Sequence, residues 1–146
     1  MPVRRLDHVS IVVADLEAAI AFFVDRLGLE VVGRSPVEGE WADRVVGLEG
    51  VRSEIAMVQT PDGHGRLELT RYDHPPARGG EPDAPSNTFG LRTVAFEVDD
   101  IRALVADLEA HGFGLVGHLE NYADVYRLCY VRGPEGIVVM LAERIG

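Results

Sequence analysis

Two polar residues on strand-like segments in the first half of this chain, His8 and Glu68, are of types that could do chemistry. Glu68 lies in GRLELT between Leu67 and Leu69, so its carboxylate points to the opposite face of a predicted strand. Burying a carboxylate in an apolar strand is costly unless a partner compensates for it. His8 is the natural partner if the two strands are neighbours. The pair predicts either a metal-binding pair or a hydrogen-bonded structural contact.

Proton transfer is a further chemistry open to this pair. A partly buried carboxylate can act as a general base or a general acid when a neighbouring side chain orients it. One hypothesis is therefore an enzyme in which Glu68 transfers a proton and His8 orients it, with a weakened metal site or with none.

Polar and aromatic residues in the second half are candidates for the lining of a ligand pocket. Arg127 lies in NYADVYRLCYVRG, an aromatic and cationic cluster that begins next to Tyr122. Its guanidinium could pair with Glu68 or Glu97, bind a ligand carboxylate through two hydrogen bonds, or remain a solvated edge residue. We therefore count Glu97, Tyr122 and Arg127 among the predicted ligand-binding residues.

The elements that must position these residues occur twice. LDHVSIVVADL (6–16) returns as LRTVAFEVDDI (91–101), and IAMVQTPDG (55–63) returns as LCYVRGPEG (128–136). Each copy begins with the alternation of a strand, continues with helical spacing and ends with three strand-like segments. Each copy is therefore a predicted βαβββ unit, and two such units suggest a shared concave site.

The chain length of 146 residues suits a single domain built from both units. We expect the first unit at 4–72 and the second at 89–146. The segment between them, 73–88, is rich in proline and glycine and is the predicted connector.

The first unit carries an insertion, EGEWADRVVGLEG, which the second lacks. Trp41, Val45 and Leu48 follow helical spacing in it, so it predicts a short helix or flap. Trp41 could stack on a planar ligand as part of a lid. Alternatively, it packs against a partner subunit or the edge of the sheet.

Composition excludes several classes of function. The net charge of −10 disfavours nucleic acid and anionic membranes as partners and suits a cationic ligand. All 14 basic residues are arginines, which excludes a lysine Schiff base. The single cysteine, Cys129, allows no internal disulfide and no thiolate cluster, and no apolar run approaches a membrane span. We expect a cytoplasmic protein.

The chain resembles the vicinal oxygen chelate superfamily, which contains glyoxalase I, bleomycin-resistance protein and extradiol dioxygenases. The segments that carry the resemblance are LDHVSIVVADLEAAIAFF with GLEVVG, LELT, GLRTVAFEVDDI and RGPEGIVVMLAE. The resemblance implies an α+β fold in which two tandem βαβββ units form a cupped mixed sheet. It also implies a divalent metal in the cup, held by one His or Glu ligand from the first and last strand of each unit.

The ligand positions of the family match this chain in the first unit only. They fall on His8 and Glu68, and then on Thr93 and Met140, where threonine is a poor ligand and methionine a soft one. The resemblance therefore implies no tightly bound cofactor, with weak binding of Zn, Ni, Mn, Mg or Fe left open. Replacing Thr93 by histidine and Met140 by glutamate is expected to restore the four-ligand set of the family.

Three classes of function follow from the resemblance. The first is a protein that binds a small molecule in the cup, as a lyase, isomerase or dioxygenase with an incomplete metal site. The second is a non-catalytic protein that sequesters a cationic antibiotic or metabolite. The third, a regulatory or scaffolding dimer, has no feature of its own in the sequence. We expect a homodimer, because paired units of this kind leave apolar edges that a second copy can cover.

Overall fold

The computed structural model describes residues 2–146 of the chain. Its internal contacts divide the chain into two compact units, Met1–Gly79 and Gly80–Gly146, called unit 1 and unit 2 below. The division falls within the predicted connector, 73–88. Each half of the sequence repeat therefore has a compact set of contacts of its own.

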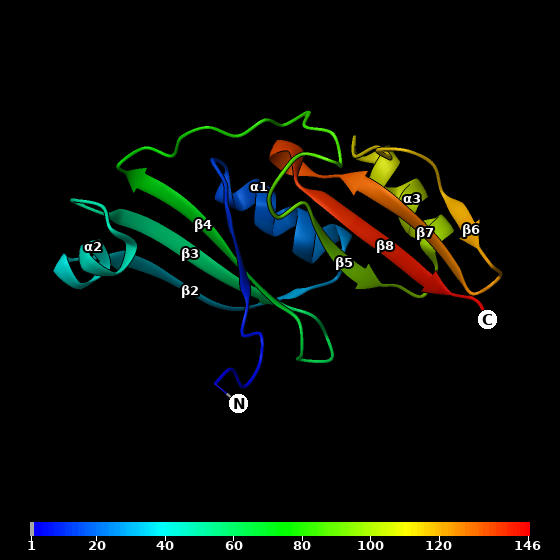
Figure 1. Cartoon of the computed structure of the whole chain (residues 1–146), viewed down its shortest axis with the longest axis horizontal. Helices are drawn as coiled ribbons and strands as arrows, with labels where there is room; N and C mark the ends of the chain where they lie inside the picture. The colour runs from blue at the N-terminus through cyan, green and yellow to red at the C-terminus, as the bar shows by residue number, and fades with distance from the viewer. Residues whose placement is uncertain (1) are drawn as a thin grey trace. The chain divides into compact units, whose positions relative to one another are not determined.

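Unit 1 has the predicted βαβββ order with one additional helix (Figure 1). Its elements are β1 (Val9–Val12), α1 (Leu16–Ala21), the π-helical turn η1 (Phe22–Arg26), β2 (Glu30–Glu38), α2 (Glu40–Val46), β3 (Arg52–Gln59) and β4 (Arg66–His74). The strands form one sheet in the order β1-β4-β3-β2. β1 runs parallel to β4, and the other pairs are antiparallel. The first and last strands are thus neighbours, which is the condition that the His8–Glu68 pair requires.

Unit 2 repeats this arrangement (Figure 1). Its elements are β5 (Thr93–Glu97), α3 (Ile101–Ala110), β6 (Glu120–Tyr122), β7 (Tyr126–Arg132), the 3₁₀ turn η2 (Pro134–Gly136) and β8 (Val138–Arg144). The strand order is β5-β8-β7-β6, with β5 parallel to β8. The predicted α+β fold of two βαβββ units is confirmed.

The strand register is also the same in both units. The pairs that show this are Ser10 with Glu68 in β1 and β4, and Ala95 with Met140 in β5 and β8. His8 and Thr93 each lie two residues before the first-strand member of these pairs. Thr93 and Met140 therefore hold the places in unit 2 that His8 and Glu68 hold in unit 1.

The core of unit 1 lies between its sheet and the α1–η1 segment. Asp15 caps α1, because its carboxylate accepts a hydrogen bond of 3.0 Å from the Ala18 amide. The helix widens into a π-turn at Phe22, and both Phe22 and Phe23 are fully buried, with ring centroids 5.1 Å apart and planes at 85°. Both rings of this wider turn therefore lie in the core.

The core of unit 2 is built in the same way. Asp100 caps α3 through the Ala103 amide, and the buried face of α3 carries Ile101, Val105 and Leu108, as the spacing predicted. Cys129 is buried on β7, and this burial raises the pKa of its thiol to about 11. Cys129 therefore packs in the core as a small buried hydrophobic residue.

In each first strand, β1 and β5, one face is accessible to solvent. In β1, Ser10 and Val12 are exposed, and in β5, Thr93, Ala95 and Glu97 are exposed. In the structure they are the faces available to a ligand.

The insertion forms the predicted short helix, α2. Asp43 ties it to the chain that follows, because its two oxygens accept hydrogen bonds from the amides of Gly50 and Val51 at 2.9 and 2.8 Å. These backbone hydrogen bonds, first that of Val51, lower the pKa of Asp43. Trp41 is 56% exposed, and Val45 is exposed beside it. The helix therefore presents an apolar surface rather than burying it within unit 1.

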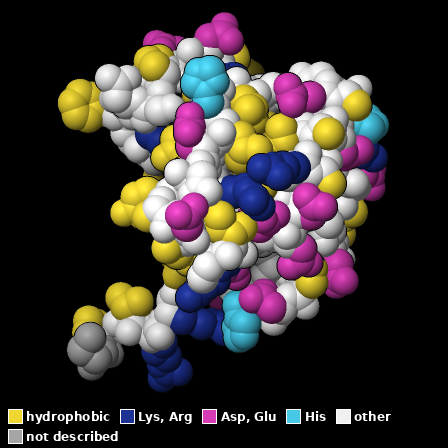
Figure 2. Space-filling model, turned by 90° about the vertical axis from the view of Figure 1, so that its right-hand side faces the viewer, with side chains coloured by type: hydrophobic (Ala, Val, Ile, Leu, Met, Phe, Trp, Pro, Cys, Tyr) yellow, Lys and Arg dark blue, Asp and Glu magenta, His cyan; other side chains and the backbone are white. Residues whose placement is uncertain are grey.

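Charged side chains are distributed rather than gathered on the face shown in Figure 2. Acidic groups lie across this face with arginines between them. Within residues 2–146, no helix has both the length and the apolar character needed to cross a membrane.

Candidate functional site

His8 and Glu68 lie next to each other in unit 1. His8 Nε2 is 3.5 Å from Glu68 Oε2, longer than the about 2.7–3.2 Å of an ordinary N–H···O hydrogen bond. The side chains are 33% and 23% exposed, so a ligand can reach both. The predicted approach of the two groups is confirmed, and their use as a binding site remains a prediction.

The far side of the His8 ring is held by Asp7. Asp7 Oδ2 lies 2.8 Å from His8 Nδ1 and accepts a hydrogen bond of 2.8 Å from Arg66 Nη2. Its other oxygen accepts a hydrogen bond of 3.1 Å from Arg5. The hydrogen bond with His8, followed by that from Arg66, lowers the pKa of Asp7 to about 2. The imidazole is therefore oriented by an ionised carboxylate.

The Glu68 carboxylate is oriented in a similar way. The hydroxyl of Thr70, a buried residue on the same strand, donates a hydrogen bond of 3.1 Å to Glu68 Oε1. The other oxygen, Oε2, is the one that faces His8. Each member of the pair is thus held on its far side and faces the other across a gap.

Sequence reasoning missed Asp7 as part of this site. Both Asp7 and His8 precede β1, and strand alternation does not predict the side-chain contacts that join Asp7 to His8 and to Arg66. A signal was present nonetheless, since an acidic residue adjoins His8 and a basic one, Arg66, shares the strand face of Glu68.

The pair fits two positions of a metal site. Two ligand atoms that each lie about 2.1 Å from a tetrahedrally coordinated ion are about 3.4 Å from each other. The distance of 3.5 Å between His8 Nε2 and Glu68 Oε2 is close to this value. The equivalent places in unit 2, Thr93 and Met140, supply neither imidazole nor carboxylate. Among residues 2–146, no group of three or more His, Cys, Asp or Glu side chains could hold an ion. The donor set is therefore incomplete, and we assign no reaction step to a metal.

Arg127 has a different partner from those predicted. Its Nη1 donates a hydrogen bond of 2.8 Å to Glu143, and so its acidic partner is neither Glu68 nor Glu97, the two considered among the alternatives. The strand register explains this partner, because Glu143 lies directly opposite Arg127 in the pairing of β7 with β8. Glu143 also accepts a hydrogen bond of 2.9 Å from the amide of Ile101, the first residue of α3. Arg127 thus helps to hold the start of this helix.

The remaining predicted residues lie apart from one another. Glu97 ends β5 and Tyr122 ends β6, and these strands form opposite edges of the unit 2 sheet. Both side chains are exposed. Trp41 lies on α2 of unit 1. The structure therefore does not bring Glu97 and Tyr122 together in one cluster.

A groove in unit 2 adds residues whose orientation the sequence left open. It has a volume of about 220 Å³ and lies beside β6 and β7. His118, Glu120 and Tyr130 bring polar groups to its lining, and Leu128 contributes an apolar surface. Combined polar and apolar walls are typical of small-molecule sites. We therefore add His118, Glu120 and Tyr130 to the candidate ligand-binding residues.

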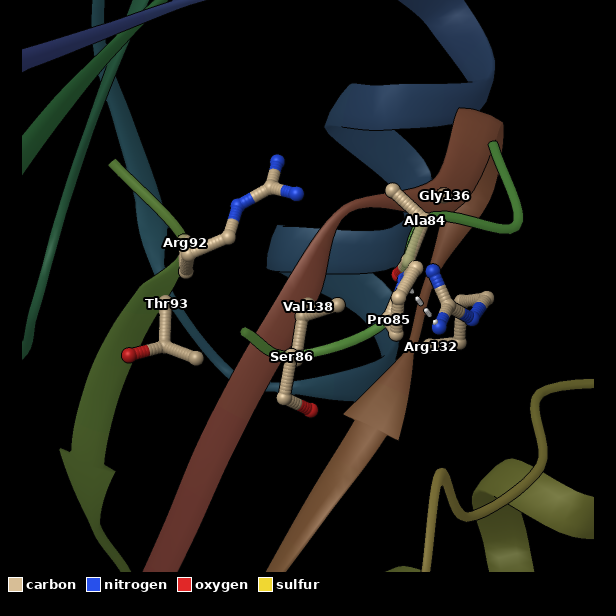
Figure 3. A pocket seen from close by; sticks show the side chains of 8 residues that line it. All are labelled: Ala84, Pro85, Ser86, Arg92, Thr93, Arg132, Gly136 and Val138. Atoms are coloured by element: carbon tan, nitrogen blue, oxygen red, sulfur yellow. Dashed lines mark hydrogen bonds between the residues drawn. The ribbon is translucent and has the colours of Figure 1, made fainter. Parts of the chain in front are cut away.

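A second cavity of unit 2 is structural. Arg132 donates a hydrogen bond of 2.8 Å to the Pro82 carbonyl and one of 2.9 Å to the Ala84 carbonyl, and so holds the connector against the sheet. Figure 3 shows Arg132 beside Ala84. The cavity beside these residues, which Thr93 also lines, has a volume of about 10 Å³. This is room for about one water molecule, so the cavity is too small for a substrate.

Comparison with known proteins agrees with the fold. Residues 5–141 match the model of the Glyoxalase/Bleomycin resistance protein/Dioxygenase superfamily. The uncharacterized protein YaeR of Escherichia coli (strain K12) is 30% identical over 141 residues, which cover 97% of each chain. A glyoxalase family protein of Bacillus cereus has a solved structure with a TM-score of 0.95 and 49% identity, covering 100% of this chain and 97% of that one.

A further solved structure is similar in fold alone. TnmS3, an antibiotic binding protein from Streptomyces sp. CB03234, has a TM-score of 0.66 and 21% identity. The alignment covers 99% of this chain and 98% of TnmS3. At this level of identity, the likeness concerns the arrangement of elements and not the ligand.

Proposed function

Because this chain belongs to the glyoxalase/bleomycin resistance protein/dioxygenase superfamily, we propose that it binds a small molecule through His8 and Glu68. The group that they hold is positively charged or donates a hydrogen bond. The observation that carries this proposal is the 3.5 Å gap between Nε2 and Oε2, two accessible atoms whose side chains are each held from the far side. A purely structural pair would be expected to close this gap to hydrogen-bonding distance.

Charge supports a cationic ligand over an anionic one. The chain carries a net charge of −10, which attracts cations at long range. Close to the site, the arginines Arg5 and Arg66 contact Asp7, whereas Glu68 contacts His8 and Thr70. A cationic metabolite or antibiotic is therefore the ligand class that we propose, and sequestration is the simplest use of such binding.

Catalysis of proton transfer is the second candidate function. Thr70 holds Oε1 of Glu68 and leaves Oε2 facing the gap, where it could accept a proton from a bound molecule. A lyase or isomerase of this kind would need no metal. The metal-dependent chemistry of the superfamily needs ligands that Thr93 and Met140 do not provide.

Two probes of equal size and opposite charge test the proposed ligand class. We expect benzamidine, a planar cation with N–H donors, to bind with millimolar affinity and to shift the amide NMR signals of Val9 and Leu67, which pair beside the site. Benzoate should leave these signals in place. Glu68→Gln should weaken benzamidine binding by about tenfold or more, because it removes a charged hydrogen-bond acceptor.

A matched variant separates the effect of losing the Glu68 carboxylate at the site from the effect of lowering the net negative charge of the protein. Glu30→Gln removes the same charge from an exposed position on β2 and should leave benzamidine binding unchanged. Equal losses in both variants, or shifts by benzoate as large as those by benzamidine, would contradict the proposed role of Glu68.

In the same samples, Ni²⁺ and Zn²⁺ should bind weakly or not at all. Tight stoichiometric binding that His8→Ala abolishes would contradict the incomplete metal site.

We also propose that the protein is a homodimer in which α2 contributes to the interface. Its exposed apolar residues are Trp41, Val45 and Val46, with Leu48 just beyond its end. Sedimentation should show a dimer of the 15.9 kDa chain at micromolar concentration. Trp41→Glu should raise the dissociation constant by about tenfold or more. Phe89→Glu, at a fully exposed position outside the helix, is the control, and a monomeric natural protein would rule the proposal out.

A further inference from the structure

The protonation of the His8 ring can be inferred from its contacts. Both oxygens of Asp7 accept hydrogen bonds from arginines, Oδ1 from Arg5 and Oδ2 from Arg66, so this carboxylate acts only as an acceptor. Oδ2 lies 2.8 Å from His8 Nδ1, and a contact of this length requires a hydrogen on the ring nitrogen. Nδ1 is therefore the donor in this hydrogen bond.

A neutral imidazole carries one N–H, so a hydrogen on Nδ1 leaves Nε2 as a bare acceptor. This acceptor faces a carboxylate oxygen, Glu68 Oε2, at 3.5 Å. Two acceptors at this distance repel each other unless a positive charge or an N–H or O–H donor lies between them. This arrangement accounts for the ligand class proposed above.

The position of Asp7 is itself fixed from the strand that carries Glu68. Arg66 lies two residues before Glu68 on β4, and its Nη2 donates to the same Asp7 oxygen that faces His8. Arg5 holds the other oxygen of Asp7 from the segment before β1. Strand β4 thus carries the acceptor Glu68. Through Arg66 and Asp7 it also orients the second acceptor, His8 Nε2.

From these contacts we propose that Asp7 is the positioning residue of the site, which fixes the His8 tautomer so that Nε2 is a bare acceptor toward Glu68. The inference rests on the proposed binding function for its biological use. The tautomer itself is a property of unit 1 and can be measured without any ligand.

Long-range ¹H–¹⁵N correlation spectra of the histidine rings test this directly. They should be recorded at about pH 8.5, above the ordinary histidine pKa of about 6.5, with the full chain. We expect His8 to show a protonated Nδ1 and a bare Nε2. In Asp7→Leu, the ratio of the Nδ1–H to the Nε2–H form should fall by about tenfold or more, because a charge-assisted hydrogen bond is lost.

Two further measurements keep the result interpretable. Asp7→Asn should retain the tautomer, because its amide oxygen can still accept from Nδ1. His74 and His111 serve as references within each spectrum, since each has Nδ1 2.8 Å from a backbone carbonyl oxygen that Asp7 does not touch. Unchanged signals from both rings would show that the variants remain folded.

Several outcomes would overturn the proposal. They are a natural protein in which His8 carries its hydrogen on Nε2 or on both nitrogens at this pH, and an Asp7→Leu variant with an unchanged tautomer. Failure of benzamidine to bind, with the expected tautomer present, would instead reject the proposed binding function and leave the role of Asp7 supported. The two conclusions can therefore fail separately.

Discussion

Phe23→Ala is expected to lower the free energy of unfolding by about 3–5 kcal/mol. The ring of Phe23 is completely buried in the core of unit 1 and meets Phe22 edge to face. Truncation removes this apolar surface from the core and leaves a cavity that the rigid sheet behind it can fill only in part. The edge-to-face contact, with centroids 5.1 Å apart, adds to the loss.

Chemical denaturation followed by tryptophan fluorescence measures this effect in the relevant unit, because the only tryptophan, Trp41, belongs to unit 1. Phe89→Ala is the matched control. Phe89 is fully exposed, so the same truncation there should change the free energy of unfolding by less than about 0.5 kcal/mol. Similar effects of the two variants would mean that Phe23 is not a core residue in solution.

Removal of the Glu143 carboxylate should have the second largest effect, because this group satisfies two partners. Glu143→Ala is expected to lower the free energy of unfolding by about 2–3 kcal/mol. The variant leaves the Arg127 guanidinium without its acceptor and the amide of Ile101 at the start of α3 without its side-chain partner. Glu143 is only 13% exposed, so water can replace it only in part.

Arg127→Met distinguishes a structural role of Arg127, as the partner of Glu143, from a role in ligand binding. It keeps an apolar stem of similar length and leaves Glu143 bonded to Ile101, so it should cost less than Glu143→Ala. Denaturation monitored by circular dichroism compares the variants. If Arg127→Met weakened ligand binding and left stability unchanged, Arg127 would have to be assigned to the binding surface, as the sequence first suggested.

The sequence predicted the two βαβββ units, because their apolar spacing and turn residues recur in both halves. It named His8 as the partner of Glu68 only on the condition that the first and last strands are neighbours, and the pairing of β1 with β4 meets that condition. The resemblance to a known family then located Thr93 and Met140. Their equivalence is visible in the shared register of the two sheets.

Contacts made by side chains over long sequence distances were beyond such rules. Asp7 meets Arg66 across 59 positions, and the alternation of neither segment fixes that contact. Spacing placed Arg127 on a strand face, but only the register of β7 with β8 puts Glu143 directly opposite it. Spacing therefore predicts faces, whereas strand neighbours and register, which decide among partners of equal charge, come from the folded structure.

The equal register of the two sheets has an evolutionary consequence. Position 93 lies on an exposed strand face and position 140 is not part of the buried core, whereas the neighbours of Met140, Val139 and Leu141, are buried. Residues at positions 93 and 140 can therefore be exchanged with little cost to folding. A duplicated unit of this kind lets one copy drift in its chemistry while selection on the core retains its shape.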